Sequence, residues 1–286
     1  LAELLKKAVR PKKNLVFTSA GNKSALSLWT NGQRDFDLFC VYYASGKEQQ
    51  LSGLSDYFAC HKGAKFPNLL WAYQNWPELI EQYERVLVLD DDLLLTAANI
   101  NRHFSLHDKE NLWLSQLAFH HRGKVNHYIN LARPFSYLRY TNFVEVNSPL
   151  FNIDMLLKFL QVYDAEVAGI GVDYWYSDLI AKLDTAQDKI AIFDIIPCCN
   201  PRDQIAKGGV REIDTAISFQ DRMKSWDVKA AKLGIERNYK KIEYRSKKPP
   251  SMLATLLPSI KILFFSTLYH AVILAKFSKP YPTKDN

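Results

Sequence analysis

The chain has 286 residues, of which 48% are hydrophobic and 13% aromatic. This composition supports a packed core and excludes disorder for most of the chain, and the length fits one large domain or one domain with a small appendage. The net charge is +7, and much of it lies in residues 237–248, where six basic side chains accompany a single acid, Glu243.

Apolar patterning alternates between the periods of helices and strands. In chain order, it predicts a helix at 1–13, strands at 14–19 and 36–43, helices at 68–76 and 78–83, a strand at 86–89, a helix at 96–104, strands at 113–118 and 143–146, helices at 154–163 and 174–183, and a strand at 189–196. Thr96 is suited to cap its helix, and Pro77 and Pro197 interrupt or stop the elements beside them. The alternation predicts an α/β sandwich with a mainly parallel central sheet.

The composition changes near residue 235, so we expect a main domain at 1–235 and a basic, then apolar, helical extension at 236–286. Its apolar part, residues 260–275, is shorter than the about 20 residues that span a bilayer. It is either a buried helix that closes the core or an interfacial helix beside the basic cluster on an anionic membrane. The basic cluster is otherwise a solvated linker, and its sparse aromatics, Tyr239 and Tyr244, argue against nucleic acid.

Two features bear on the cellular compartment. Residues 1–13 lack the apolar core of a signal peptide. Cysteines at positions 40, 60, 198 and 199 show neither a disulfide framework nor the spacing of metal ligands. We therefore expect reduced thiols in a cytoplasmic protein with peripheral membrane contact at most.

Three consecutive acids, Asp90, Asp91 and Asp92, follow the apolar strand at 86–89. A parallel strand buried on both faces brings its carboxyl end to the crevice where open α/β sheets bind ligands. Neighbouring carboxylates repel one another there and need a cation. Their hard oxygens suit Mg²⁺ or Mn²⁺ together with substrate phosphates. The alternative is a solvated acidic turn.

A second motif, GIGVDYW, covers residues 169–175. Its glycines permit a tight loop with close ligand approach, and Asp173 stands at the start of the helix that follows. Asp173 is a candidate general base or only the helix N-cap. Tyr174 and Trp175 offer an apolar wall for the face of an acceptor sugar, or are ordinary core residues.

Candidate donor-binding residues follow two other strands. The loop after residues 14–19 carries Thr18, Ser19, Gly21 and Asn22, and small residues there let backbone N–H groups approach a nucleotide. Lys62 and Lys65 can neutralise phosphate oxygens as point charges, although exposed lysines often have no specific role. The histidines at 120, 121 and 127 are interpreted as loop or surface residues.

Several separated motifs occur together in one order. They are VFTSAGN at 16–22, FDLF at 36–39, KGAKFPNL at 62–69, LDDD at 89–92, LRYTNFVE at 138–145 and GIGVDY at 169–174. The Asp-x-Asp pattern after a hydrophobic strand resembles that of metal-dependent GT-A glycosyltransferases. The whole set, over residues 14–201, more narrowly resembles a plant and bacterial family of glycosyltransferase candidates catalogued as a domain of unknown function.

The resemblance implies a GT-A-like nucleotide-binding fold in which Asp90 and Asp92 hold Mn²⁺ or Mg²⁺ on the donor diphosphate. It implies that Asp173 is the catalytic residue and that Asp91 supports donor binding or the local structure. A late histidine often completes the metal site in such enzymes, but here the corresponding position is Asn200. Asn200 is therefore the candidate for a third, weaker ligand.

The function expected from this resemblance is hexosyl transfer from a nucleotide-sugar, a UDP-sugar first, to a glycan or lipid-linked acceptor in surface polysaccharide synthesis. Two other classes stay open. One is a non-catalytic glycan- or nucleotide-binding module on the same fold. The other is a metal-dependent nucleotidyltransferase or phosphohydrolase, since such enzymes also place carboxylates on metal ions.

Overall fold

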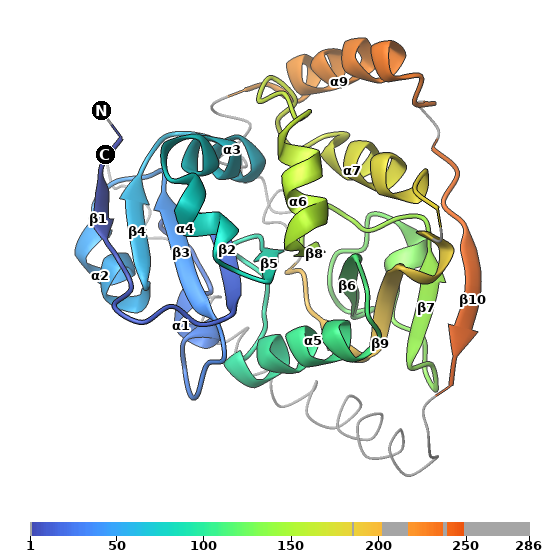
Figure 1. Cartoon of the computed structure of the whole chain (residues 1–286), viewed down its shortest axis with the longest axis horizontal. Helices are drawn as coiled ribbons and strands as arrows, with labels where there is room; N and C mark the ends of the chain where they lie inside the picture. The colour runs from blue at the N-terminus through green and yellow to red at the C-terminus, as the bar shows by residue number, and fades with distance from the viewer. Residues whose placement is uncertain (1, 185, 202–216, 237–238, 249–286) are drawn as a thin grey trace, which may run out of the picture.

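The computed structural model describes residues 2–184, 186–201, 217–236 and 239–248. Across these residues, ten strands form one sheet in the order β1-β4-β3-β2-β5-β8-β6-β9-β7-β10 (Figure 1). The strands are β1 Leu4–Lys6, β2 Asn14–Ala20, β3 Asp37–Tyr42, β4 Tyr57–Cys60, β5 Arg85–Val88, β6 Leu114–Phe119, β7 Leu138–Thr141, β8 Leu150–Asn152, β9 Ile190–Cys198 and β10 Glu243–Lys247.

Helices cover both faces of this sheet. They are α1 Leu26–Trp29, α2 Glu48–Leu54, α3 Lys65–Asn75, α4 Pro77–Glu81, α5 Ala97–Lys109, α6 Ile153–Leu160, α7 Val172–Ala181 and α9 Phe219–Leu233, with short 3₁₀ turns η1 Tyr128–Asn130 and η2 Ala186–Asp188. In Figure 1, α3, α6, α7 and α9 lie along one side, and α1 and α5 lie along the other.

The strands divide their side chains between two cores. Leu15 and Phe17 of β2 pack with α3, α4, α6 and α7, whereas Val16 packs with α1 and α5. The same alternation runs through Val86 and Leu87 of β5, as the two-residue period of a strand requires. Burial on both faces explains why these segments are continuous apolar runs, and the strands predicted at 14–19 and 86–89 are confirmed.

The sheet is mixed, which corrects the mainly parallel sheet that we expected. Four strand pairs are parallel and five are antiparallel among the described residues. Because β8 is antiparallel to both of its neighbours, β5 and β6 still point the same way. The carboxyl ends of six strands therefore lie along the same side of the sheet, where α/β folds bind ligands. These strands are β2, β3, β4, β5, β6 and β9.

Two predicted elements are wrong, and so is one predicted boundary, because β9 continues through Pro197 to Cys198. The helix at 1–13 is absent; Leu4–Lys6 instead pairs antiparallel with β4, because an open sheet edge offers backbone partners that a short isolated helix lacks. Residues 143–146 form no strand. Side chains satisfy that buried segment: the Ser177 hydroxyl accepts the Val144 N–H at 3.2 Å, and the Gln116 amide oxygen accepts the Glu145 N–H at 2.5 Å.

Part of the C-terminal extension joins the sheet. Strand β10 pairs with β7, Arg245 pairs with Asp188, and Lys247 pairs with Glu110. Arg245 and Lys247 thus form ion pairs within the protein, whereas we expected the basic cluster to be a solvated linker or to face an anionic surface. Residues 260–275 lie outside the described residues, and no helix within the described part is long and apolar enough to cross a membrane. The domain boundary at 235/236 stays a prediction.

Candidate active site

The three aspartates form an acidic turn (Asp90, Asp91 and Asp92) directly after β5. The backbone N–H of Asp90 donates to the Asn147 carbonyl at 2.8 Å, and the N–H of Leu94 donates to the Cys199 carbonyl at 2.9 Å. The turn is thereby tied to the loop before β8 and to the end of β9. Its carboxylates lie at the common edge where the parallel strands end.

Each carboxylate of the acidic turn has different surroundings. Asp90 pairs with the Lys65 ammonium at 2.5 Å, and its side chain is 33% exposed. Asp91 accepts the N–H of Gly21 at 2.8 Å, so it holds the loop that follows β2. Asp92 faces the end of β9, since its charge adds to burial in raising the pKa of the Cys199 thiol to about 11.

Lys65, the first residue of α3, is almost surrounded by oxygen. Besides Asp90, its ammonium donates to the carbonyls of Val146 at 2.7 Å, Asn147 at 3.2 Å and Val88 at 3.4 Å. These bonds join α3, β5 and the loop before β8 at one point. Lys62 is exposed at the end of β4. The phosphate roles predicted for both lysines stay predictions.

The predicted donor loop is built on side-chain hydrogen bonds. Thr18 is fully buried within β2, and Ser19 accepts a hydrogen bond from the Asn68 amide at 2.7 Å. Asn22 accepts the Tyr42 hydroxyl at 2.5 Å. Gly21 and Asn22 lie beyond the carboxyl end of β2, where ligands bind in α/β folds. Thr18 and Ser19 are buried within β2 and support the loop.

Asp173 and Glu145 form a second acidic group, the buried acid pair. Asp173 is 6% exposed and is the second residue of α7, so it is not the N-cap. Gly171 is the cap, with a positive φ of 84°, and a Cβ there would lie 1.9 Å from the Trp226 ring. Only glycine fits that position, and this fixes how α7 presents Asp173.

Desolvation is the largest influence on the pKa of Asp173. Burial raises its pKa to about 6, while hydrogen bonds from the N–H groups of Tyr174 and Val146 and the charge of Lys241 oppose the rise. The Tyr174 N–H lies 3.0 Å from Oδ1, and Nε2 of His127 lies 3.9 Å from Oδ2. A carboxyl whose pKa approaches neutrality is suited to proton transfer.

Glu145 is 2% exposed. The side-chain amides of Asn126 and Asn130 donate to its two oxygens at 2.5 and 2.6 Å. Burial raises the pKa of Glu145 to about 7, the amide of Asn126 opposes this, and the charges of Asp173 and Asp90 add to it. The charges of Asp173 and Asp90 also help to raise the pKa of the buried Tyr176 hydroxyl. The loop before β8 joins the acidic turn to the buried acid pair, because the Asn147 carbonyl accepts the Asp90 N–H and the Val146 N–H donates to Asp173.

The sequence reasoning missed two members of this site. We interpreted His127 as a loop or surface residue, but it is half-buried and packs edge-on against Phe143, with ring centroids 5.0 Å apart. Glu145 is the last residue of the LRYTNFVE motif at 138–145, and the sequence alone assigned it no function. A lone carboxylate inside the apolar run FVEV at 143–146 was the available signal, because buried acids require partners.

The two predicted acceptor residues point in different directions from α7. Tyr174 is half-buried near the acids, with its ring 5.6 Å from that of Phe143. Trp175 is 3% exposed and packs against Phe159 and Tyr163, because successive helical residues point about 100° apart. Trp175 has no free face, and the Tyr174 ring is itself contacted by Trp226 and Tyr239, so the acceptor role of both residues stays a prediction.

The residues present fit a divalent cation in part. Within the described ranges, no group of three or more His, Cys, Asp or Glu side chains is arranged to hold a metal. Asn200 is 3% exposed, and its backbone carbonyl accepts the Lys124 N–H at 2.8 Å. Asp90 and Asp92 nevertheless supply hard oxygens, and one or two carboxylates suffice when substrate phosphates complete the coordination.

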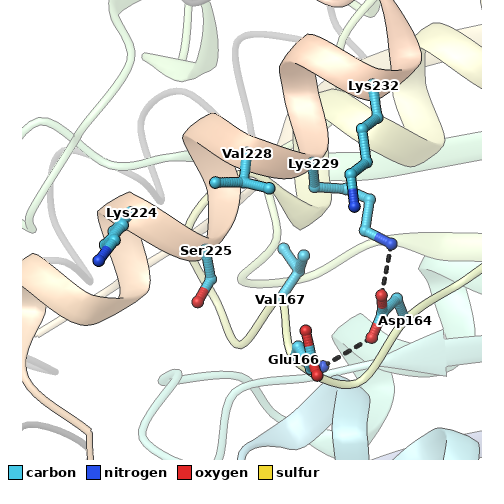
Figure 2. A pocket seen from close by; sticks show the side chains of 8 residues that line it. All are labelled: Asp164, Glu166, Val167, Lys224, Ser225, Val228, Lys229 and Lys232. Carbon is cyan, nitrogen blue, oxygen red and sulfur yellow. Dashed lines mark hydrogen bonds and ion pairs between the residues drawn. The ribbon is translucent and has the colours of Figure 1, made fainter.

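A cavity of about 220 Å³ lies elsewhere, between α9 and residues 164–167 (Figure 2). Lys229 pairs there with Asp164, which also accepts the Glu166 N–H at 3.1 Å. None of the residues predicted from the sequence lines this cavity. The candidate site at the carboxyl ends of the strands therefore lies apart from this cavity.

No family model matches the chain, and no curated protein matches it. Solved structures of S. aureus TarS are similar to it. TarS residues 1–349 match with a TM-score of 0.45 and 9% identity over 78% of this chain and 74% of that chain. The same region in complex with UDP-GlcNAc gives a TM-score of 0.48 and 11% identity over 77% and 66%. At these values, the chain and the TarS structures are similar only in the general arrangement of the fold.

Proposed function

We propose that the chain is a glycosyltransferase that moves a sugar from a nucleotide-sugar donor to a hydroxyl of a glycan or lipid-linked acceptor. One observation carries this proposal: the loop before β8 contacts both the acidic turn and Asp173 at the carboxyl ends of the parallel strands. A diphosphate requires the charge compensation that a cation on the turn provides, and an attacking hydroxyl requires a base.

The chain's own residues divide the work. Asp173 accepts the proton of the attacking hydroxyl if the reaction inverts configuration, and Tyr174 contacts the acceptor. The Gly21–Asn22 loop and Lys62 meet the donor. When bound on Asp90 and Asp92, Mn²⁺ or Mg²⁺ supplies charge stabilisation to the departing nucleoside diphosphate. Asn200 is proposed as a weaker ligand, and a UDP-sugar as the first donor to test.

The test combines binding and turnover. Thermal unfolding is measured with a panel of nucleotide-sugars, UDP-GlcNAc included, with Mn²⁺ and after chelation, because a ligand of the native state raises its stability. With the stabilising donor, Asp90→Ala and Asp92→Ala should each lower metal-dependent turnover by about 10²–10³-fold. Asp178→Asn, at an aspartate that pairs with Lys182 on the far part of α7, is the matched control. Full activity in either alanine variant would contradict the proposal.

A second candidate is a non-catalytic nucleotide- or glycan-binding module. The observation that favours it is the Lys65 ammonium, which already neutralises Asp90 without a metal. Such a module would bind its ligand equally well after chelation and would release no product. Release of pyrophosphate instead of a nucleoside diphosphate would indicate a nucleotidyltransferase.

A further inference from the structure

The segment after α9 carries Lys241 to the buried acid pair. It is held by Asn142, whose side-chain amide donates to the Lys240 carbonyl at 2.9 Å and whose side-chain oxygen accepts the Ile242 N–H at 2.7 Å. The Asn142 N–H donates in turn to the Ile242 carbonyl at 3.1 Å. These three bonds fix the register of the segment before β10 joins the sheet.

The Lys241 ammonium lies against two aromatic rings of the site. It is 4.9 Å from the ring centroid of Phe143 and 4.7 Å from that of Tyr174, and 3.4 Å from the Tyr174 hydroxyl. Cations bind the faces of such rings favourably. Burial lowers the pKa of Lys241, while the charges of Asp173 and Glu145 oppose that change. The ammonium thus lies on the side chain of the residue that follows Asp173, and its charge lowers the pKa of Asp173.

The other groups that face Asp173 carry no positive charge at neutral pH. Burial and the neighbouring Lys241 lower the pKa of His127 to about 4, so its imidazole is neutral. Glu145 is itself an acid, and the Tyr174 hydroxyl is neutral because burial raises its pKa to about 12. Lys65 is engaged by Asp90 and three carbonyls. Among the described residues, Lys241 is the cation that acts on Asp173.

We propose that Lys241 is a positioning residue of this site, whose ammonium keeps Asp173 in the carboxylate form that accepts the acceptor's proton. The inference rests on the proposed function for the identity of that proton. It assigns part of the C-terminal extension to the catalytic centre. The electrostatic relation between Lys241 and Asp173 is a property of the fold and can be measured without any substrate.

The test follows the Asp173 carboxyl by ¹³C NMR during a pH titration of the full chain labelled at aspartate, with Asp173→Asn identifying the signal. In Lys241→Met, which keeps the apolar stem over both rings, the titration midpoint should rise by about 0.5–1 pH unit, because an opposite charge has been removed. Lys241→Arg should restore the wild-type midpoint. Lys240→Met, a neighbouring exposed lysine, should leave it unchanged. An unchanged midpoint in a folded Lys241→Met protein would overturn the inference.

Kinetics with an active donor provide the second readout. In Lys241→Met the acidic limb of the pH profile of kcat/KM, which reports the free enzyme, should move to higher pH by the same amount. In Lys241→Arg it should stay at the wild-type position. A purely structural role would lower activity at every pH and leave the limb in place, which would also overturn the inference. If the NMR midpoint moves but no nucleotide-sugar is turned over, the proposed function fails while the role of Lys241 toward Asp173 stands.

Discussion

The acidic turn and the buried acid pair lie in one site and handle negative charge in opposite ways. In the acidic turn, Asp90 has the Lys65 ammonium and Asp91 has a backbone N–H. In the buried acid pair, Asp173 and Glu145 are desolvated, and burial is the largest cause of their raised pKa values. The acidic turn has polar partners for its carboxylates, whereas burial raises the pKa values of the buried acid pair toward neutrality.

This difference indicates a division of labour. Ionised carboxylates at a strand edge are suited to a cation and its phosphates, whereas carboxyls with a pKa near neutrality are suited to proton transfer. The two tasks need opposite environments, so a single cluster of acids could not perform both. The fold separates them by taking the turn from the end of β5 and Asp173 from the first turn of α7.

The largest expected effect tests whether proton transfer belongs to the buried acid pair. Asp173→Asn keeps an oxygen for the Tyr174 N–H but cannot accept a proton, so kcat should fall by about 10²–10⁴-fold. Donor affinity, measured by calorimetry, should be unchanged. Asp178→Asn, on the same helix and paired with Lys182 at the surface, is the matched control. A loss of donor affinity in Asp173→Asn would assign the residue to donor binding and remove the distinction between the two groups.

The sequence predicted the acidic turn much better than the buried acid pair. Asp90, Asp91 and Asp92 are contiguous and follow a strand whose burial is evident from its apolar run. Glu145, His127 and Lys241 come from segments far apart in the chain, and only the fold brings them beside Asp173. The absent strand at 143–146 has the same cause: Ser177 and Gln116, distant in sequence, replace its sheet partners.

A second prediction concerns stability and pH. The pKa of Asp173 in the folded state lies near 6, above the value of 3.8 for an unperturbed aspartate. Between about pH 4 and 6 the unfolded chain loses a proton that the folded chain retains, so this group lowers stability as pH rises through that window. A shift of this size is equivalent to about 3 kcal/mol at most above pH 6.

Denaturant unfolding of wild type and Asp173→Asn at pH 4, 5, 6 and 7 measures this effect. The two proteins should have similar free energies of unfolding at pH 4. Above pH 6 the variant should be the more stable, because it has no charge to desolvate. A difference that is constant across the range would show that Asp173 is not desolvated, and would make the buried acid pair resemble the acidic turn.

The smallest effect tests whether Lys65 stabilises the acidic turn. Lys65→Met removes the ammonium that joins Asp90 to the carbonyls of Val146 and Asn147. The free energy of unfolding should fall by about 1–2 kcal/mol, less than for a fully buried ion pair because Asp90 is one-third exposed. Lys62→Met, at an exposed site three residues earlier, should leave stability unchanged. If Lys65→Met keeps wild-type stability and loses only donor affinity, the ammonium serves the donor phosphates, and the acidic turn then needs a bound cation to offset its charge.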